Sequence, residues 1–127
     1  MKKISLFCFC FFILGLVAQA QDVKRSFEVL EFDLIARTKP RMDLNEIPCA
    51  VLRVSAADIK GYQFEGNIIG DIVYNPGEAI IYMTNNSRNI TIKSDLFGTE
   101  KYEFPERLRK QVAYKLSLKV EAPEETY

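Results

Sequence analysis

The chain has 127 residues, with 17 Lys and Arg and 17 Asp and Glu, so its formal net charge is zero. A neutral balance gives no electrostatic reason to expect nucleic acid or an anionic membrane surface as the main partner. The sequence contains no histidine, which removes Ser-His-Asp and Cys-His catalysis and most zinc chemistry.

The first twenty residues have the pattern of a secretory leader. A basic start, MKK, precedes an uncharged apolar run over residues 4–17, and Ala18-Gln19-Ala20 supplies the small residues that signal peptidase requires. The run is shorter than the roughly 20 residues that span a bilayer, which disfavours a permanent anchor. We expect a signal peptide over residues 1–20, export to the periplasm or the cell exterior, and no transmembrane anchor after cleavage.

The cysteines limit covalent cross-linking. Cys8 and Cys10 lie in the leader, so Cys49 is the single cysteine of residues 21–127 and no intrachain disulfide can form there. Cys49 lies in PCAVLRV, a run of strand-forming residues, which favours a buried structural thiol over a reactive one. Residues 21–127 have the size of one ordinary domain.

The first half of this domain alternates between strand and loop signals. We expect a short linker over residues 21–25, a first strand that begins at Phe27, and a short strand over residues 34–38. A loop containing Pro40 and Pro48 follows. The segment 49–55, CAVLRVS, is apolar on both alternating faces, as expected for a strand that is covered on both sides.

The second half continues the same pattern. Strands are expected over residues 62–65, 68–74, 79–84, 90–93 and 101–104. Turns between them are predicted at Asn75-Pro76-Gly77, Asn85-Asn86-Ser87 and Leu96-Phe97-Gly98, where glycine or asparagine accepts a positive φ. Pro105 is suited to open one helical turn through Arg109.

The last strand has the clearest pattern. In QVAYKLSLKV five apolar residues share one face at period two: Val112, Tyr114, Leu116, Leu118 and Val120. The segment 121–127 is acidic and is expected to be a flexible tail. Short strands separated by turn signals predict an all-β fold, a small antiparallel β-sandwich of about seven to eight strands after an N-terminal signal helix.

The glycines near residue 70 do not form a phosphate-binding loop. Gly66, Gly70 and Gly77 lack the spacing of the dinucleotide fingerprint, and the segment that follows them, AIIYMT, is a strand rather than a helix. These glycines are better explained by turns, a bulge or a close backbone approach.

Several short motifs, in this order, resemble a known domain. The matching stretches are Asp33-Leu34 with Ala36-Arg37-Thr38, Pro48-Cys49-Ala50, Phe64-Glu65-Gly66 with Gly70-Asp71, Pro76-Gly77-Glu78, and Thr91-Ile92-Lys93 with Gly98 and Tyr102-Glu103-Phe104. Together they cover most of residues 26–120, and this region is similar to the PEGA-like, carboxypeptidase-regulatory-like β-sandwich domains at the N-terminus of secreted proteins of Gram-negative gut bacteria. The resemblance implies a noncatalytic, envelope-associated domain that usually precedes a larger module.

Arg37, Lys39 and Arg41 form the candidate binding site. On an extended segment these alternating side chains would project to one side and form a basic edge. Such an edge would dock an acidic glycan, a peptidoglycan carboxylate or a partner domain. The alternative is a solvated strand edge whose charges prevent aggregation.

Two further groups of residues have competing interpretations. Glu65, Asp71 and Glu78 offer carboxylates for a hydrolase, but no neighbouring feature indicates the raised pKa that a catalytic acid needs. Asp71, Asn75 and Glu78 offer ligands for calcium, but they lack the spacing of an EF-hand loop, and structural roles are favoured for all of them. Five tyrosines offer either a sugar-stacking platform or cross-strand packing: Tyr62, Tyr74, Tyr82, Tyr102 and Tyr114.

These features together predict a noncatalytic binding or presentation module with no catalytic residue, cofactor or metal. The expected partner is another envelope protein or cell-wall glycan. The two alternatives are a structural spacer of a larger secreted protein and a carboxylate-based hydrolase.

Overall fold

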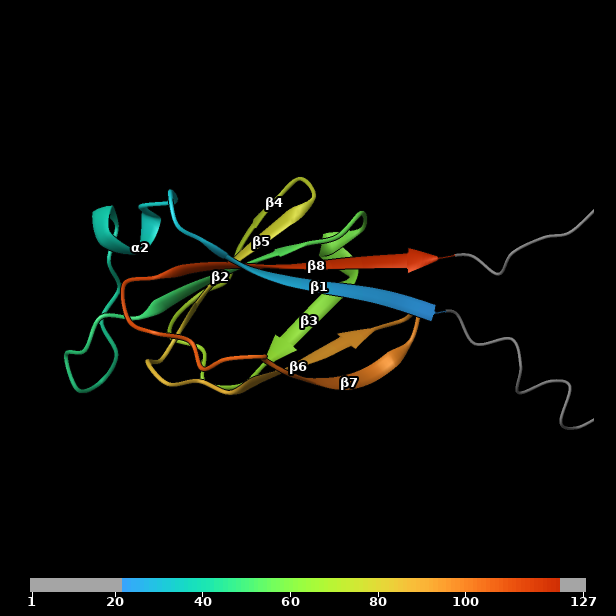
Figure 1. Ribbon diagram of the computed structural model, residues 1–127. Coiled ribbons are helices and arrows are strands. Elements are labelled where there is room, and N and C mark those ends of the chain that lie inside the picture. Colours follow the sequence, from blue (N-terminus) through green and yellow to red (C-terminus); the bar gives the residue numbers. More distant parts are fainter. Residues whose placement is uncertain (1–21, 122–127) are drawn as a thin grey trace, which may run out of the picture.

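The computed structural model describes residues 22–121, which form eight strands in two facing sheets (Figure 1). The larger sheet has the order β1-β8-β2-β5-β4 and the smaller has the order β3-β6-β7. The elements are β1 (Asp22–Leu30), α2 (Ile35–Thr38), β2 (Ala50–Ser55), the 3-10 turn η1 (Ile59–Gly61), β3 (Tyr62–Glu65), β4 (Val73–Asn75), β5 (Glu78–Met83), β6 (Asn89–Ser94), β7 (Gly98–Glu103) and β8 (Ala113–Glu121). The predicted all-β sandwich is confirmed.

The larger sheet is mixed rather than wholly antiparallel. Strand β2 pairs antiparallel with β5 but parallel with β8, where Val51 lies opposite Ala113 and Ser55 opposite Ser117. The remaining pairs in both sheets are antiparallel. Strand β2 is therefore central and covered on both faces, as its apolar sequence predicted.

The core lies between the sheets and is built from alternating residues. Leu52 of β2 and Leu116 of β8 face Ile90 and Ile92 of β6, and all four side chains are buried. Burying a side chain of this size contributes roughly 1.5–3 kcal/mol relative to leaving it exposed. The alternation predicted for β8 is confirmed, because Tyr114, Leu116 and Leu118 all enter this core.

Side chains link the two sheets at both margins. Arg25 of β1 forms an ion pair with Glu100 of β7 on one side. On the other side the hydroxyl of Tyr74 in β4 donates to the carbonyl of Tyr62 in β3 at 3.2 Å. These contacts tie the edge strands of one sheet to those of the other.

Two predicted boundaries near the N-terminus are wrong. Residues 22–25 belong to β1 instead of a linker, because β1 pairs with β8 along its whole length, from Asp22 opposite Glu121 to Leu30 opposite Ala113. The segment 34–38 contains a helical turn instead of a strand, and the amide of Thr38 donates to the carbonyl of Leu34 at 2.8 Å.

Other differences are smaller. Of the predicted 68–74 strand only Val73 and Tyr74 join the sheet, as part of β4, while Ile68 makes a single bridge to Met83. Residues 105–109 form no helical turn. The three predicted turns are present, with φ of 76° at Gly77, 71° at Asn86 and 84° at Gly98.

The leader over residues 1–20 and the tail residues 122–127 lie outside the described residues. Within residues 22–121, none of the helical segments has the length and apolar character needed to cross a bilayer.

Candidate functional site

One end of the sandwich carries an unusual share of the exposed apolar side chains. It is the end that bears α2 and the loop after it, opposite the start of β1 and the end of β8 (Figure 1). Eight large apolar residues are exposed among residues 22–121, and five of them come from the segment 32–47: Phe32, Leu34, Met42, Leu44 and Ile47. We call these five residues the loop-end surface.

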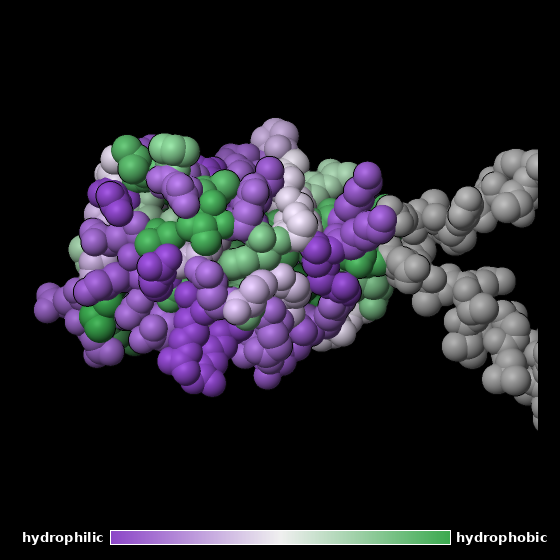
Figure 2. Space-filling view, viewed as in Figure 1, coloured by the Kyte–Doolittle hydropathy of each residue, from purple (hydrophilic) through white to green (hydrophobic). Residues whose placement is uncertain are grey.

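Phe32 and Leu44 are the extreme members of this surface. Their side chains are 95% and 96% exposed. Apolar side chains interrupt the hydrophilic surface at this end of the molecule (Figure 2). Scattered apolar residues are normal on a protein surface, but five exposed ones within one sixteen-residue segment exceed the share of any other part of residues 22–121 and favour a protein-binding role for this end.

The loop that carries Leu44 is held by its own hydrogen bonds. The carboxylate of Asp43 accepts the amides of Asn45 at 2.8 Å and Ile47 at 3.0 Å, and the amide of Asp43 donates to the carbonyl of Ile47 at 3.0 Å. Glu46 adopts φ of 62° to complete the turn. Leu44 is therefore held at the tip of a structured loop.

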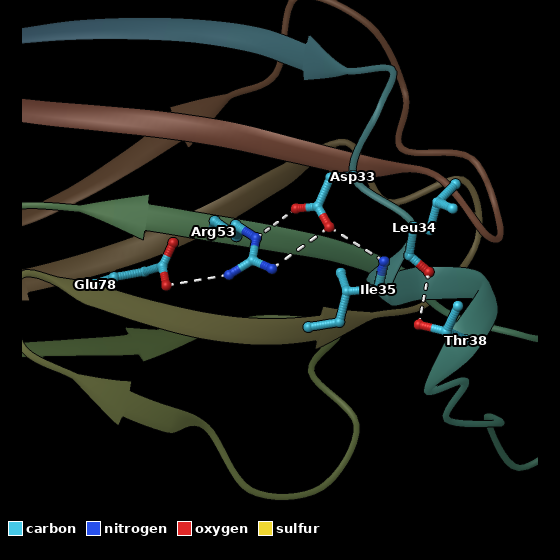
Figure 3. A network of polar contacts seen from close by, with 6 residues as sticks. All are labelled: Asp33, Leu34, Ile35, Thr38, Arg53 and Glu78. Atoms are coloured by element: carbon cyan, nitrogen blue, oxygen red, sulfur yellow. Dashed lines mark hydrogen bonds and ion pairs between the residues drawn. The ribbon is translucent and has the colours of Figure 1, made fainter.

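A polar network holds α2 against the larger sheet (Figure 3). Arg53 of β2 donates from Nε to Asp33 Oδ2 at 2.5 Å and from Nη1 to Glu78 Oε2 at 3.1 Å. Asp33 Oδ1 in turn accepts the amide of Ile35 at 3.1 Å, so that one carboxylate connects β2 to the first residue of α2. This tertiary contact explains why residues 34–38 form a helical turn.

The network shifts two pKa values. The hydrogen bond from Arg53 holds the pKa of Asp33 below its ordinary value, although burial opposes the shift. The hydrogen bond to Asp33 likewise raises the pKa of Arg53. Both groups are therefore ionised at neutral pH and act as a structural pair.

Arg41 joins the loop to the segment before β4. Its Nη1 donates to the carbonyls of Ile69 at 2.7 Å and Asp71 at 2.8 Å. Its guanidinium carbon lies 4.2 Å from the ring centroid of Tyr82. Arg41 Nη1 is thus already used inside the molecule.

A cavity of about 280 Å³ lies beside α2, and we call it the α2 cavity. Its walls come from the end of β1, from Asp33 and Leu34, from Arg37 of α2 and from Arg109 with residues 111–113. Gln111 adopts φ of 60° at this position. Leu34 belongs both to this cavity and to the loop-end surface.

The predicted basic edge is not formed. Its premise was an extended segment, but Arg37 lies in α2, while Arg41 is bound to the carbonyls described above. Lys39 is exposed after the end of the helix. Of the three candidates, only Arg37 lines the α2 cavity.

The acidic candidates are placed apart. Glu65 of β3 pairs with Lys93 at 2.8 Å in the smaller sheet, whereas Glu78 of β5 pairs with Arg53 in the larger sheet. Asp71 is exposed and contributes its backbone carbonyl to Arg41. Among residues 22–121 no group of three or more His, Cys, Asp or Glu is placed to hold a metal ion.

The tyrosines do not form a common platform. Tyr62, Tyr82 and Tyr114 are buried, Tyr102 is half-buried, and only Tyr74 is exposed. The hydroxyl of Tyr82 donates to the carbonyl of Lys39 at 2.9 Å, and that of Tyr114 accepts the amide of Arg109 at 2.9 Å. Cross-strand packing is therefore the role that the structure assigns to most of them.

The chain was compared with protein-family models, curated proteins and solved structures. None of the three comparisons gives a match.

Sequence reasoning missed the loop-end surface and the α2 cavity. One local signal was available: Phe32 lies between the acidic residues Glu31 and Asp33, where two charged neighbours make a large apolar side chain hard to bury. The cavity had no such signal, because residues 29–37 and 109–113 meet only through the pairing of β1 with β8.

Proposed function

We propose that the chain is an exported, noncatalytic β-sandwich module that binds a partner protein through the loop-end surface. The observation that carries the proposal is the near-complete exposure of Phe32 and Leu44 on structured segments at one end of the sandwich. Export is supported by the leader pattern of residues 1–20. The resemblance to PEGA-like envelope domains agrees with a binding role.

The energetics favour such a contact. Covering one exposed Phe or Leu side chain on association is worth roughly 1.5–3 kcal/mol. The hydrogen bonds of Asp43 hold the loop before binding, so little conformational entropy is lost when a partner covers Leu44.

A protein partner is favoured over cell-wall glycan. A glycan platform needs several exposed aromatic rings on one surface, whereas Tyr62, Tyr82 and Tyr114 are buried. The aliphatic side chains of Leu44 and Met42 fit an apolar protein surface better than a sugar.

The test is capture of envelope proteins by the chain and by a Phe32→Ser, Leu44→Ser variant. A matched control is Leu96→Ser, which removes an exposed apolar side chain outside the loop-end surface. We expect a specific protein to be lost with the double variant and kept with the control, with unchanged circular dichroism for all three. Equal capture by all three chains contradicts the proposal.

A further inference from the structure

The α2 cavity offers two guanidinium groups to a ligand. Among the described residues the Arg37 side chain makes no hydrogen bond or ion pair, and Arg109 Nη2 is 3.9 Å from Glu106 Oε1 in an exposed contact of little strength. Guanidinium groups bind carboxylates through paired N–H donors. The Arg37 side chain is therefore free to bind an external carboxylate. The Arg109 side chain also interacts with the hydroxyl of Tyr114, which raises the pKa of Arg109 and keeps its guanidinium charged at the cavity wall.

Two acidic residues also line the cavity and affect what it can bind. Asp33 is already paired with Arg53, so its charge is compensated within the molecule. Glu31 makes no hydrogen bond or ion pair among the described residues and would repel a bound anion. Replacing Glu31 by a neutral residue should therefore strengthen the binding of an anion in the cavity.

The chain itself contains a segment of matching chemistry. Residues 122–127, APEETY, carry two glutamates and no basic residue, and they begin with two small apolar residues. Strand β8 starts at the α2 cavity and runs to the opposite end of the sandwich (Figure 1). The segment 122–127 is therefore joined to the chain at the end of the sandwich that lies away from the cavity.

Geometry prevents the segment from reaching the cavity of its own chain. The nine residues of β8 span about 27 Å. Six residues in a fully extended conformation span at most about 22 Å. The segment can therefore reach an α2 cavity only on another molecule.

We propose that the acidic segment 122–127 of one copy binds in the α2 cavity of a second copy, with Glu124 or Glu125 paired to Arg37 and Arg109. The proposal rests on the proposed function, since it names a second copy as the partner that the α2 end binds. The contact is head to tail, so it leaves a free cavity and a free segment and allows an open series of copies. The bound segment would also cover Leu34, which lines the cavity.

The experiment is sedimentation equilibrium of the chain from Gln21 to Tyr127 at increasing protein concentration. The mean mass should rise with concentration at low ionic strength and fall as salt is added, because exposed ion pairs are screened. An Arg37→Glu, Arg109→Glu variant and a Glu124→Arg, Glu125→Arg variant should each weaken association at least about tenfold. Glu31→Gln should strengthen association.

The decisive measurement mixes the two charge-reversed variants. Each variant alone repels its own kind, whereas in the mixture each cavity meets a segment of opposite charge, so association should return. A Lys60→Glu, Lys101→Glu variant makes the same change in net charge outside the cavity and should associate as the unmodified chain does. Circular dichroism checks folding, which should be unchanged because the substituted arginines are exposed.

Three results would overturn the proposal. They are a mass that stays monomeric at every concentration, association that is equally strong in both charge-reversed variants and the unmodified chain, and a mixture of the two variants that fails to associate. The outcome is separable from that of the proposed function. If the chain stays monomeric while capture of a partner still depends on Phe32 and Leu44, head-to-tail assembly is wrong and the proposed function stands.

Discussion

Arg41 and Tyr82 form the contact that joins the loop after α2 to the larger sheet. The guanidinium carbon lies 4.2 Å from the ring centroid, and the same guanidinium donates to the carbonyls of Ile69 and Asp71. The hydroxyl of Tyr82 donates to the carbonyl of Lys39, on the same loop. A residue that the sequence placed on a basic binding edge therefore serves as an internal support for the loop-end surface.

Replacing Arg41 by lysine should lower the free energy of unfolding by about 1–2 kcal/mol. A lysine keeps the charge but lacks the planar group that lies against Tyr82, and its shorter side chain does not place its ammonium where Arg41 Nη1 donates to the two carbonyls. Urea unfolding followed by circular dichroism measures the change. Arg37→Lys is the matched control, because the Arg37 side chain has no partner among the described residues, and its stability should be unchanged. Equal losses in both variants would contradict this role of Arg41.

Gly70 is required where the backbone passes under Arg41. Gly70 has φ of 74°, and a Cβ at this position would lie 2.9 Å from Arg41 Nη1. Gly98 has a similar φ of 84° but open space around it, so alanine there adds only the backbone cost of roughly 1 kcal/mol. Gly70→Ala should therefore destabilise the protein more than Gly98→Ala. In an Arg41→Ala background the two glycine substitutions should become similar, and a persisting difference would contradict the contact.

The Asp33–Arg53 pair should make stability depend on acid pH. Because the pKa of Asp33 is lowered in the folded state from an ordinary value of 3.8, the stabilisation is complete above that value. It is lost as the pH falls from about 4 through the lower folded-state pKa, since the unfolded chain then binds the proton more tightly.

Asp33→Asn tests this pH dependence. Asparagine can still accept the amide of Ile35, but it loses the charge that attracts Arg53. The variant should be less stable by about 1–2 kcal/mol at neutral pH and should approach the original chain at low pH. Urea unfolding over a range of pH measures both. A difference that stays constant across the range would show that the charge of Asp33 is not the cause.

The sequence predicted those elements whose residues alternate or run apolar over a whole strand. Strands β2 and β8 were found because Leu52, Tyr114 and Leu116 belong to long patterns that local chemistry does not oppose. The turn at Pro76-Gly77 was found because few other residues accept the required φ values. These are cases in which local preference and tertiary packing agree.

The failures occurred where a distant residue decides the local structure. The segment 34–38 contains Ile35 and Thr38, which favour strands. It nevertheless forms a helical turn, where the carboxylate of Asp33 accepts the amide of Ile35 and is itself fixed by Arg53, far along the chain. The start of β1 is polar, and its pairing with β8 alone makes it a strand. The α2 cavity likewise depends on topology, which a single sequence pattern does not contain.

Cys49 should resist thiol reagents in the folded protein. Its side chain is buried, and burial raises the pKa of the thiol, with the nearby charge of Asp43 adding to the effect. A chromogenic disulfide reagent should therefore react slowly with the native chain from Gln21 to Tyr127 and rapidly after unfolding in urea. Rapid reaction in the native state would contradict the structural role of this thiol.

Tyr114 connects the core to the wall of the α2 cavity. Its side chain is fully buried, and its hydroxyl accepts the amide of Arg109 at 2.9 Å. Tyr114→Phe leaves that amide without its partner and should cost about 1 kcal/mol of stability. Tyr102→Phe is the control, because the Tyr102 hydroxyl makes no hydrogen bond within residues 22–121, and it should be neutral. Thermal unfolding of both variants measures the difference in stability. Head-to-tail association should weaken only in Tyr114→Phe, because this variant lacks the hydrogen bond that positions the backbone of Arg109. Equal stability of the two variants would remove this link between the core and the cavity.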